Sequence, residues 1–279
     1  MSKIRKIAQI IQGIDATDGA GVKLVRLFGQ PHTASFDPFL MMDGLDSVDP
    51  ADYQNGFPWH PHRGIETVTY IIEGNVGHHD SLGNKGVINS GDAQWMTAGS
   101  GIIHQEMPKQ AERMHGIQLW LNLPQKHKMT KPAYGDILHH NIPVVKEAGS
   151  TIKVIAGKYK TTKGAFTGKY VAPNFLGIEL AKGASWELQT PSSHTLFVYV
   201  LEGSVDFAGT KVATKQVALF EKGDTVKASA GEDGAKFLLL HAEPIGEPIA
   251  WGGPIVMNTE AELHQAFAEL RADTFIKHD

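Results

Sequence analysis

The sequence predicts an all-β protein built from a duplicated β-barrel domain, with one α-helix near the C-terminus. Short apolar runs rich in β-branched and aromatic side chains predict the strands. The 30 glycines and 14 prolines among 279 residues separate these runs, as expected of many short strands joined by turns. Strands at this spacing are typical of a sandwich or barrel. An internal repeat predicts that the barrel occurs twice.

Four runs show the strand pattern most clearly. They are residues 66–72, 116–121, 195–201 and 237–240. Each is bounded by Gly, Pro or Asn, which end regular structure. The single helix is predicted after Thr259, because Thr259 and Glu262 have the spacing of a capping box. Its apolar face is formed by residues at helical spacing, namely Leu263, Ala266, Phe267 and Leu270.

The repeat joins residues 70–76 (YIIEGNV) with residues 199–205 (YVLEGSV). Each copy is followed by a Gly-Asp pair, at Gly91 and at Gly223, in the same order and at nearly the same offset. The strand pattern is interrupted near residues 141–150. We therefore predict an N-terminal domain over residues 1–143 and a C-terminal domain over residues 144–279 that ends in the helix.

Composition excludes several classes of function. The chain has 26 Lys+Arg and 30 Asp+Glu, a formal net charge of -4, so no bulk nucleic-acid or anionic-membrane binding is expected. It has no cysteine, which excludes disulfides, thiolate zinc sites, iron–sulfur clusters and a cysteine nucleophile. Neither a signal peptide nor an apolar run of the ~20 residues needed to span a membrane is recognisable. We expect a soluble, cytoplasmic protein.

Two short motifs predict a metal site. Side chains alternate faces along a strand, so His60 and His62 point the same way and Arg63 points the other way. His104 and Glu106 have the same spacing, after a glycine-rich turn. On facing strands of a barrel the two pairs would converge as three imidazoles and one carboxylate. Neutral imidazole is a common ligand of transition metals.

This set of donors restricts the kind of metal. Three nitrogens and one carboxylate oxygen leave coordination positions open, unlike a closed structural zinc site. Fe(II), Mn(II), Ni(II) and Co(II) suit such a set, and Cu or Zn is also compatible. The residues alone do not choose among these metals. We expect one divalent transition metal per chain.

The roles of neighbouring residues are less determined. Glu66 lies an even number of residues after His62, so it could be a ligand, a second-shell partner of a histidine, or part of a cross-strand pair. We favour the second-shell role, because metal-bound imidazoles usually donate their other N–H to such a group. Phe57 and Trp95 are close in sequence to the ligand pairs and could line an apolar cavity over the metal.

Two further histidines are expected away from this site. His78 and His79 are adjacent in the sequence, so their side chains diverge on an extended chain. We predict that they lie in a loop or face solvent.

The sequence resembles the pirin family of the cupin superfamily. The matching segments are residues 18–22 (DGAGV), 37–40 (DPFL), 57–70 (FPWHPHRGIETVTY), 91–106 (GDAQWMTAGSGIIHQE), 118–122 (QLWLN) and 254–259 (PIVMNT). They span residues 18 to about 260 in the family's order, and the long blocks are specific. The resemblance implies a bicupin fold, in which two antiparallel jelly-roll β-barrels lie face to face.

The resemblance also implies which residues hold the metal. In the pirin pattern iron is bound by His60, His62, His104 and Glu106, whereas the general cupin pattern would place the ligand glutamate at Glu66. The choice of Glu106 therefore depends on the pirin match. Second-shell or pocket positions are expected among the remaining residues of the matching segments, namely Phe57, Arg63, Glu66, Trp95 and Gln118. In the second repeat the His-x-His positions fall at about Gln189 and Pro191, which predicts no metal site there.

Two functions follow from the resemblance. The first is a dioxygenase that opens the heterocycle of quercetin-like flavonols with O₂ and releases carbon monoxide, with Glu106 taking the proton of the substrate's 3-hydroxyl as catalytic base. The alternative is a non-catalytic, iron-dependent redox sensor that binds a regulatory protein partner. Nothing in the sequence identifies such a partner.

Overall fold

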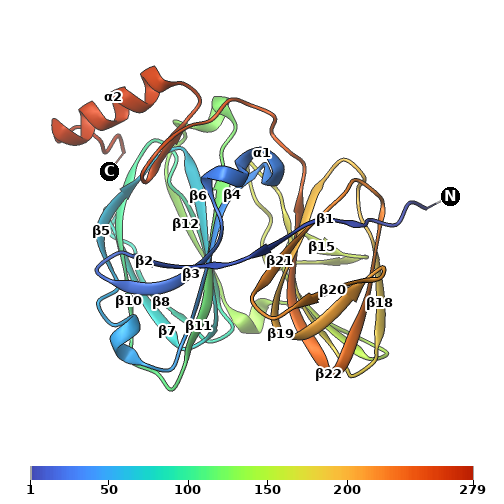
Figure 1. The fold of residues 1–279 in the computed structure, drawn as a ribbon. Coiled ribbons are helices and arrows are strands. Elements are labelled where there is room, and N and C mark those ends of the chain that lie inside the picture. The colour runs from blue at the N-terminus through green and yellow to red at the C-terminus, as the bar shows by residue number, and fades with distance from the viewer. Residues whose placement is uncertain (1, 279) are drawn as a thin grey trace. The chain divides into compact units, whose positions relative to one another are not determined.

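The computed structural model describes residues 2–278 and confirms an all-β chain with a C-terminal helix (Figure 1). The chain forms two compact units, each of which is assembled from separate stretches. One unit contains the chain up to Gly13, Ala34–Pro38 and His140–Pro244, and the other contains Ile14–Thr33, Phe39–His139 and the chain from Ile245 onward. We call them the C-terminal barrel and the N-terminal barrel. These units differ from a simple division after residue 143, because each end of the chain packs with the other half.

Two antiparallel sheets build the N-terminal barrel. The larger has the strand order β12-β9-β6-β11-β4-β3-β2, with β2 Ile14–Asp18, β3 Val22–Phe28, β4 Phe39–Ser47, β6 Ile65–Glu73, β9 Ala93–Thr97, β11 Met114–Asn122 and β12 Ala133–Ile137. The smaller has the order β5-β10-β7-β8, with β5 Phe57–His62, β7 Asn75–Asp80, β8 Lys85–Asn89 and β10 Ile102–Pro108.

Strand β6 shows how sequence sets the two faces of the larger sheet. It pairs with β9 and β11, so that Thr69 stands opposite both Gln94 and Gln118. Facing residues of paired strands share one side of a sheet, and successive residues alternate sides. Thr67 and Thr69 therefore share one face, and Glu66 lies on the other. Both faces of β6 are buried over most of its length, so polar residues such as Glu66 and Thr69 lie in the interior and need hydrogen-bond partners there.

The C-terminal barrel is built on one sheet with the order β1-β21-β19-β22-β17-β14-β13, to which β18 and β20 add at the side. Its strands are β1 Ile7–Gln12, β13 Val144–Glu147, β14 Ser150–Ala156, β17 Asn174–Leu180, β18 Ser185–Gln189, β19 Thr195–Phe207, β20 Thr210–Ala213, β21 Gln216–Phe220 and β22 Thr225–Ala242, with a separate hairpin of β15 Lys158–Tyr159 and β16 Thr162–Lys163. Its core contains aliphatic residues and aromatics such as Trp186, Phe207 and Phe237.

Strand β1 belongs to this barrel because it pairs antiparallel with β21. Between the strands lie short helices, which are η1 Gln30–His32, α1 Thr33–Phe36, η2 Pro50–Asp52, η3 Gln125–His127 and η4 His139–Asn141.

The predicted repeat has a structural counterpart. In both copies the shared glycine has a left-handed backbone, with φ +96° at Gly74 and +73° at Gly203. This left-handed backbone is accessible to glycine at little cost, which accounts for the Glu-Gly pair in both segments. Gly74 separates β6 from β7, and Gly203 coincides with a register shift inside β19.

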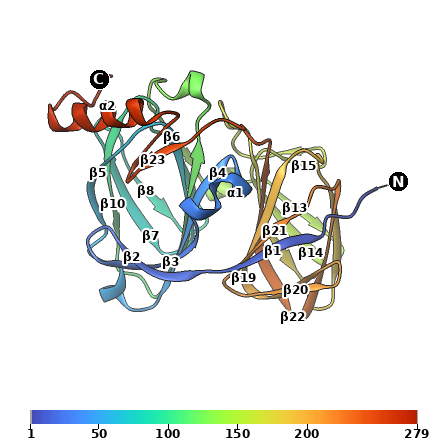
Figure 2. The ribbon, with the colours of Figure 1, turned by 45° about the horizontal axis from the view of Figure 1, so that its top comes forward.

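The C-terminal end of the chain returns to the N-terminal barrel. It forms the hairpin β23 Ala250–Gly252 and β24 Ile255–Met257, followed by helix α2 Glu260–Arg271. The predicted capping box is present, because the Thr259 side chain accepts from the Glu262 amide and the Glu262 side chain accepts from the Thr259 amide. Both views place α2 beside the end of this barrel that carries β5 (Figures 1 and 2). Among residues 2–278, no helix has the length and apolarity required to span a membrane.

Candidate metal centre

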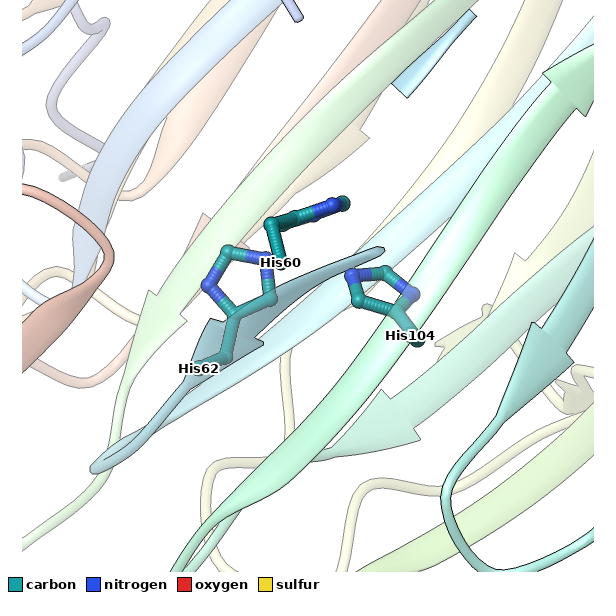
Figure 3. A group of neighbouring side chains, drawn as sticks. All are labelled: His60, His62 and His104. Atoms are coloured by element: carbon teal, nitrogen blue, oxygen red, sulfur yellow. The ribbon is translucent and has the colours of Figure 1, made fainter. Parts of the chain in front are cut away.

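Three imidazoles converge inside the N-terminal barrel (Figure 3). His60 and His62 come from β5 and His104 from the neighbouring β10, where His104 stands directly opposite His60. The ring centroids of His60 and His104 are 4.3 Å apart, and those of His62 and His104 are 5.0 Å apart. One nitrogen from each ring lies within 4.8 Å of the other two. The predicted histidines are therefore close enough together to form a candidate site for a single metal ion.

An irregularity in β5 helps to aim these side chains. The pairing of β5 with β10 shifts between His104 and Glu106, so that Glu106 stands opposite Phe57. One extra residue on β5 is the signature of a β-bulge, which bends a strand and redirects its side chains. Within this stretch the Nδ1 of His60 donates to the carbonyl oxygen of Pro58 at 2.8 Å. That bond leaves the Nε2 of His60 for a ligand.

The other two imidazoles also fit a metal. The Nδ1 of His62 donates to the carbonyl oxygen of Pro254 at 3.2 Å, which again leaves Nε2 free. His104 is 1% exposed, and neither of its ring nitrogens has a hydrogen-bond partner. Buried polar atoms without partners are costly and rare. A cation bound by the three histidines would satisfy one nitrogen of His104, so the residues present fit a metal.

Burial also sets the protonation state of the histidines. Loss of solvent and, to a smaller extent, the nearby His60 lower the pKa of His62 to about 3. Desolvation, followed by the charges of His62, His60 and His78, holds the pKa of His104 well below its usual value. His62 and His104 are therefore neutral at physiological pH. Neutral imidazole is the form that binds metal, so no proton has to be displaced from these two ligands.

Glu106 also faces the interior of the N-terminal barrel, but its carboxylate is hydrogen-bonded to Thr69. It lies two residues after His104 on β10, and alternate residues of this strand are buried. Its Oε1 accepts a hydrogen bond from the hydroxyl of Thr69 at 2.9 Å. Glu106 is outside the group of ligand atoms that lie within 4.8 Å of one another, among the residues that the structure describes.

Thr69 links Glu106 to Gln118. The Thr69 hydroxyl is 2.6 Å from the side-chain oxygen of Gln118 as well as 2.9 Å from Glu106. A hydroxyl carries one hydrogen and donates to one acceptor at a time. When the Gln118 amide is rotated so that its nitrogen faces Thr69, Gln118 donates to Thr69 and Thr69 donates to Glu106. The three residues then form a directed chain that orients the carboxylate.

Comparison with known families decides the classification. The family model "Pirin" matches residues 21–121, and the model "Pirin C-terminal cupin domain" matches residues 175–276. The chain belongs to the pirin family. Both cupin domains of a pirin are present, as the resemblance implied.

Individual relatives cover almost the whole chain. A pirin-like protein of Caulobacter vibrioides is 43% identical over 98% of this chain and 99% of its own length. A Pseudomonas aeruginosa protein that is provisionally named a quercetin 2,3-dioxygenase is 42% identical, over 97% and 98% respectively. A crystal structure of a quercetin 2,3-dioxygenase from Acinetobacter baumannii is 37% identical, covers 98% of both chains and superimposes with a TM-score of 0.89.

The structure places Glu66 and Trp95 on the face of β6 and β9 opposite to Thr69. Glu66 is three residues from Thr69, and its carboxylate accepts from the Thr97 hydroxyl at 2.7 Å rather than from an imidazole. Trp95 stands opposite Val68, which shares the Glu66 face. Strand alternation counted from His62 predicted that Glu66 would share the face of the histidines. The count fails because Gly64, at φ +77°, lies in a turn between β5 and β6 and interrupts the alternation.

Phe57 and Arg63, the other two expected neighbours of the metal site, lie in different places. Phe57 stands opposite Glu106 on the neighbouring strand and packs in a small apolar cluster with Val22 and Ile71. Arg63 points away from the histidines, as alternation predicted. It binds the C-terminal part of the chain through Glu269 and the carbonyl oxygen of Phe275.

Sequence reasoning missed several residues around the triad. His78 is 3% exposed and lies inside the barrel, with its ring 5.4 Å from that of His104, so the prediction of a loop or solvent position was wrong. Its Nε2 lies 3.3 Å from Asp80 Oδ2. Trp120 packs edge-on against His62, with centroids 4.9 Å apart. The alternation of His78 and Asp80 along β7 was the available signal, because residues two apart share a face.

Proposed function

We propose that this pirin is a metal-dependent dioxygenase that opens the heterocycle of quercetin-like flavonols with O₂ and releases carbon monoxide. The observation that carries the proposal is the convergence of His60, His62 and His104, of which His62 and His104 are buried and neutral, with a carboxylate held on the same interior face by a hydroxyl. The relatives named for quercetin 2,3-dioxygenase support the same reaction class.

The proposed ligands are the three histidines and Glu106. A divalent transition metal held there would supply Lewis-acid and oxygen-activating chemistry. Nitrogen and oxygen donors without thiolate suit Fe(II), Mn(II), Ni(II) or Co(II), and the pirin pattern favours Fe(II) among them. The Nδ1 hydrogen bonds to Pro58 and Pro254 fix the tautomers of His60 and His62, which leaves the Nε2 of each ring for the metal.

Glu106 is the proposed proton acceptor. A flavonol must lose the proton of its 3-hydroxyl before its ring is attacked, and a carboxylate within reach of the hydroxyl can accept that proton. The hydroxyl of Thr69 donates to Glu106 Oε1, which leaves Oε2 as the oxygen for the substrate. Gln118 orients Thr69 from the opposite side. Phe57, opposite Glu106, provides apolar surface that excludes water and favours an aromatic substrate.

The proposal is tested with Glu106→Gln. Glutamine keeps the shape of the side chain but cannot accept the proton, so turnover of quercetin should fall at least about a hundredfold. Bound metal, measured by elemental analysis, should fall much less, because the three histidines remain. Glu112→Gln, the same change at an exposed glutamate beyond the end of β10, is the matched control and should leave turnover unchanged. Unchanged turnover in Glu106→Gln would remove Glu106 from the proposed reaction.

A further inference from the structure

We propose that residues 250–276, here called the C-terminal segment, position His62 and thereby set the metal affinity of the N-terminal barrel. The proposal rests on the metal site proposed above. The segment joins β23, β24 and α2, and all of it belongs to the same compact unit as the triad. In sequence it lies next to the second barrel, far from all three histidines.

The most direct contact is between backbone and ligand. The carbonyl oxygen of Pro254 accepts the hydrogen bond from His62 Nδ1 at 3.2 Å. Two residues later the amide of Val256 donates to the carbonyl oxygen of Arg63 at 3.1 Å, next to His62 in the chain. Partners that hold the second nitrogen of a metal-bound imidazole fix its tautomer and ring orientation. The turn between β23 and β24 therefore supplies this partner for His62.

Arg63 binds the C-terminal segment at a second position, near its end. Its guanidinium donates to the carbonyl oxygen of Phe275 at 2.8 Å and pairs with Glu269 Oε2 at 2.8 Å. It also lies 4.2 Å from the centroid of the Phe275 ring. Its Nε donates to the carbonyl oxygen of Ser100, and the residue is 2% exposed. A charge buried to this extent is costly unless every donor is matched, so loss of Glu269 loosens the contact.

A third contact joins the turn after His62 to β24. Lys128 Nζ donates to the carbonyl oxygens of Gly64 and Val256, each at 2.8 Å. A Cβ at Gly64 would lie 1.9 Å from the oxygen of Val256, so the two backbones approach closely because no side chain intervenes. The position of β24 therefore constrains the turn that directly follows His62.

An aromatic pair supports His62 from its other side. Trp120 packs edge-on against the imidazole at 4.9 Å, and Trp251 of β23 lies 5.9 Å from Trp120. The segment thus contacts His62 directly through one hydrogen bond, and it reaches His62 indirectly because Trp251 packs against Trp120. Coupling between two sites is reciprocal, so metal binding should in turn stabilise the segment.

The test measures metal binding rather than turnover. Wild type, Glu269→Ala and Glu260→Ala are titrated with Co²⁺ against a chelator, and the d–d absorption spectrum of the bound ion is recorded. Glu260→Ala is the matched control, because Glu260 is an exposed glutamate on the same helix. We expect Glu269→Ala to weaken Co²⁺ binding about tenfold and to shift the spectrum, since loss of such supporting contacts costs 10–100-fold in affinity. The control should match wild type. Phe275→Leu, which removes the ring beside Arg63, is a second variant in case Glu269→Ala does not fold.

Hydrogen exchange tests the reciprocal effect. Co²⁺ should slow amide exchange in residues 250–257 of wild type, at Val256 above all, and should leave β13 and β14 of the other unit unchanged. The slowing should diminish in Glu269→Ala. Unaltered Co²⁺ affinity and spectrum in folded Glu269→Ala or Phe275→Leu would overturn this proposal alone. Failure of wild type to bind Co²⁺ would overturn the proposed metal site, and this proposal with it.

Discussion

Replacing Thr69 by valine removes one hydroxyl from the interior of the N-terminal barrel and keeps the branched shape of the side chain. The hydroxyl lies 2.9 Å from Glu106 Oε1 and 2.6 Å from the Gln118 oxygen, and the residue is 7% exposed. Valine can neither donate to Glu106 nor accept from Gln118. The variant therefore separates the orientation of the carboxylate from its presence.

The expected loss follows from the strength of the missing bond. A hydrogen bond to a charged group contributes about 1.5–3 kcal/mol when buried. If this bond holds Glu106 in the position from which it accepts the proton, the loss appears in the activation barrier, and turnover falls about ten- to a hundredfold. Metal content should stay near that of wild type, because the hydrogen bonds that hold His60 and His62 are made to Pro58 and Pro254 and do not involve Thr69.

The assay is carbon monoxide release from quercetin by the iron-loaded protein, normalised to bound iron. Thr97→Val is a closely matched control, since Thr97 donates to the buried carboxylate of Glu66 at 2.7 Å on the other face of the sheet. Thr97→Val should lower the free energy of unfolding but leave turnover unchanged. Turnover of Thr69→Val within twofold of wild type, at equal iron content, would refute the orienting role of Thr69.

Two further predictions concern stability, measured by urea denaturation. Burial raises the pKa of Glu66 from 4.5 to about 7, so between these values the folded chain keeps a proton that the unfolded chain has lost, and stability falls as pH rises. Glu66→Gln should therefore reduce the loss of stability between pH 5 and pH 8 by on the order of 3 kcal/mol, and an unaltered pH profile would contradict the raised pKa. Gly64→Ala should destabilise by more than the ~1–2 kcal/mol of left-handed strain, because the new Cβ meets the Val256 oxygen. Gly83→Ala, at φ +84° with nothing within 4 Å, should show the strain alone, and equal losses would argue against the close approach.

The fold was largely accessible from sequence because its signals are local. The four predicted runs all lie in strands, namely β6, β11, β19 and β22, and the helix begins at its capping box. The shared glycine of the repeat has a left-handed backbone in both copies, at Gly74 and at Gly203. The packing of the chain ends was not accessible, because β1 and the C-terminal segment are held by contacts to residues about 200 positions away, such as those between Arg63 and Phe275.

The candidate site was predictable where alternation runs without interruption. His60 and His62 share a face of β5, and His104 and Glu106 share a face of β10, so the pairs were recognisable from spacing. Alternation failed for Glu66 because the turn at Gly64 intervenes.

Residues from strands that carry no motif could not be found by spacing. Thr69 and Trp120 reach the site through the register of β6 and β11, which sequence alone does not fix. The backbone carbonyl of Pro254, which holds His62, leaves no signature in residue type.

The most direct test of the central claim is anaerobic reconstitution with Fe(II), followed by quercetin and O₂ with direct detection of carbon monoxide. The His60→Ala/His62→Ala double variant is the control, because it removes both β5 members of the triad. We predict one carbon monoxide per quercetin consumed by wild type and none from the double variant. Absence of carbon monoxide from wild type with iron bound would contradict the dioxygenase and favour a non-catalytic, metal-dependent regulator.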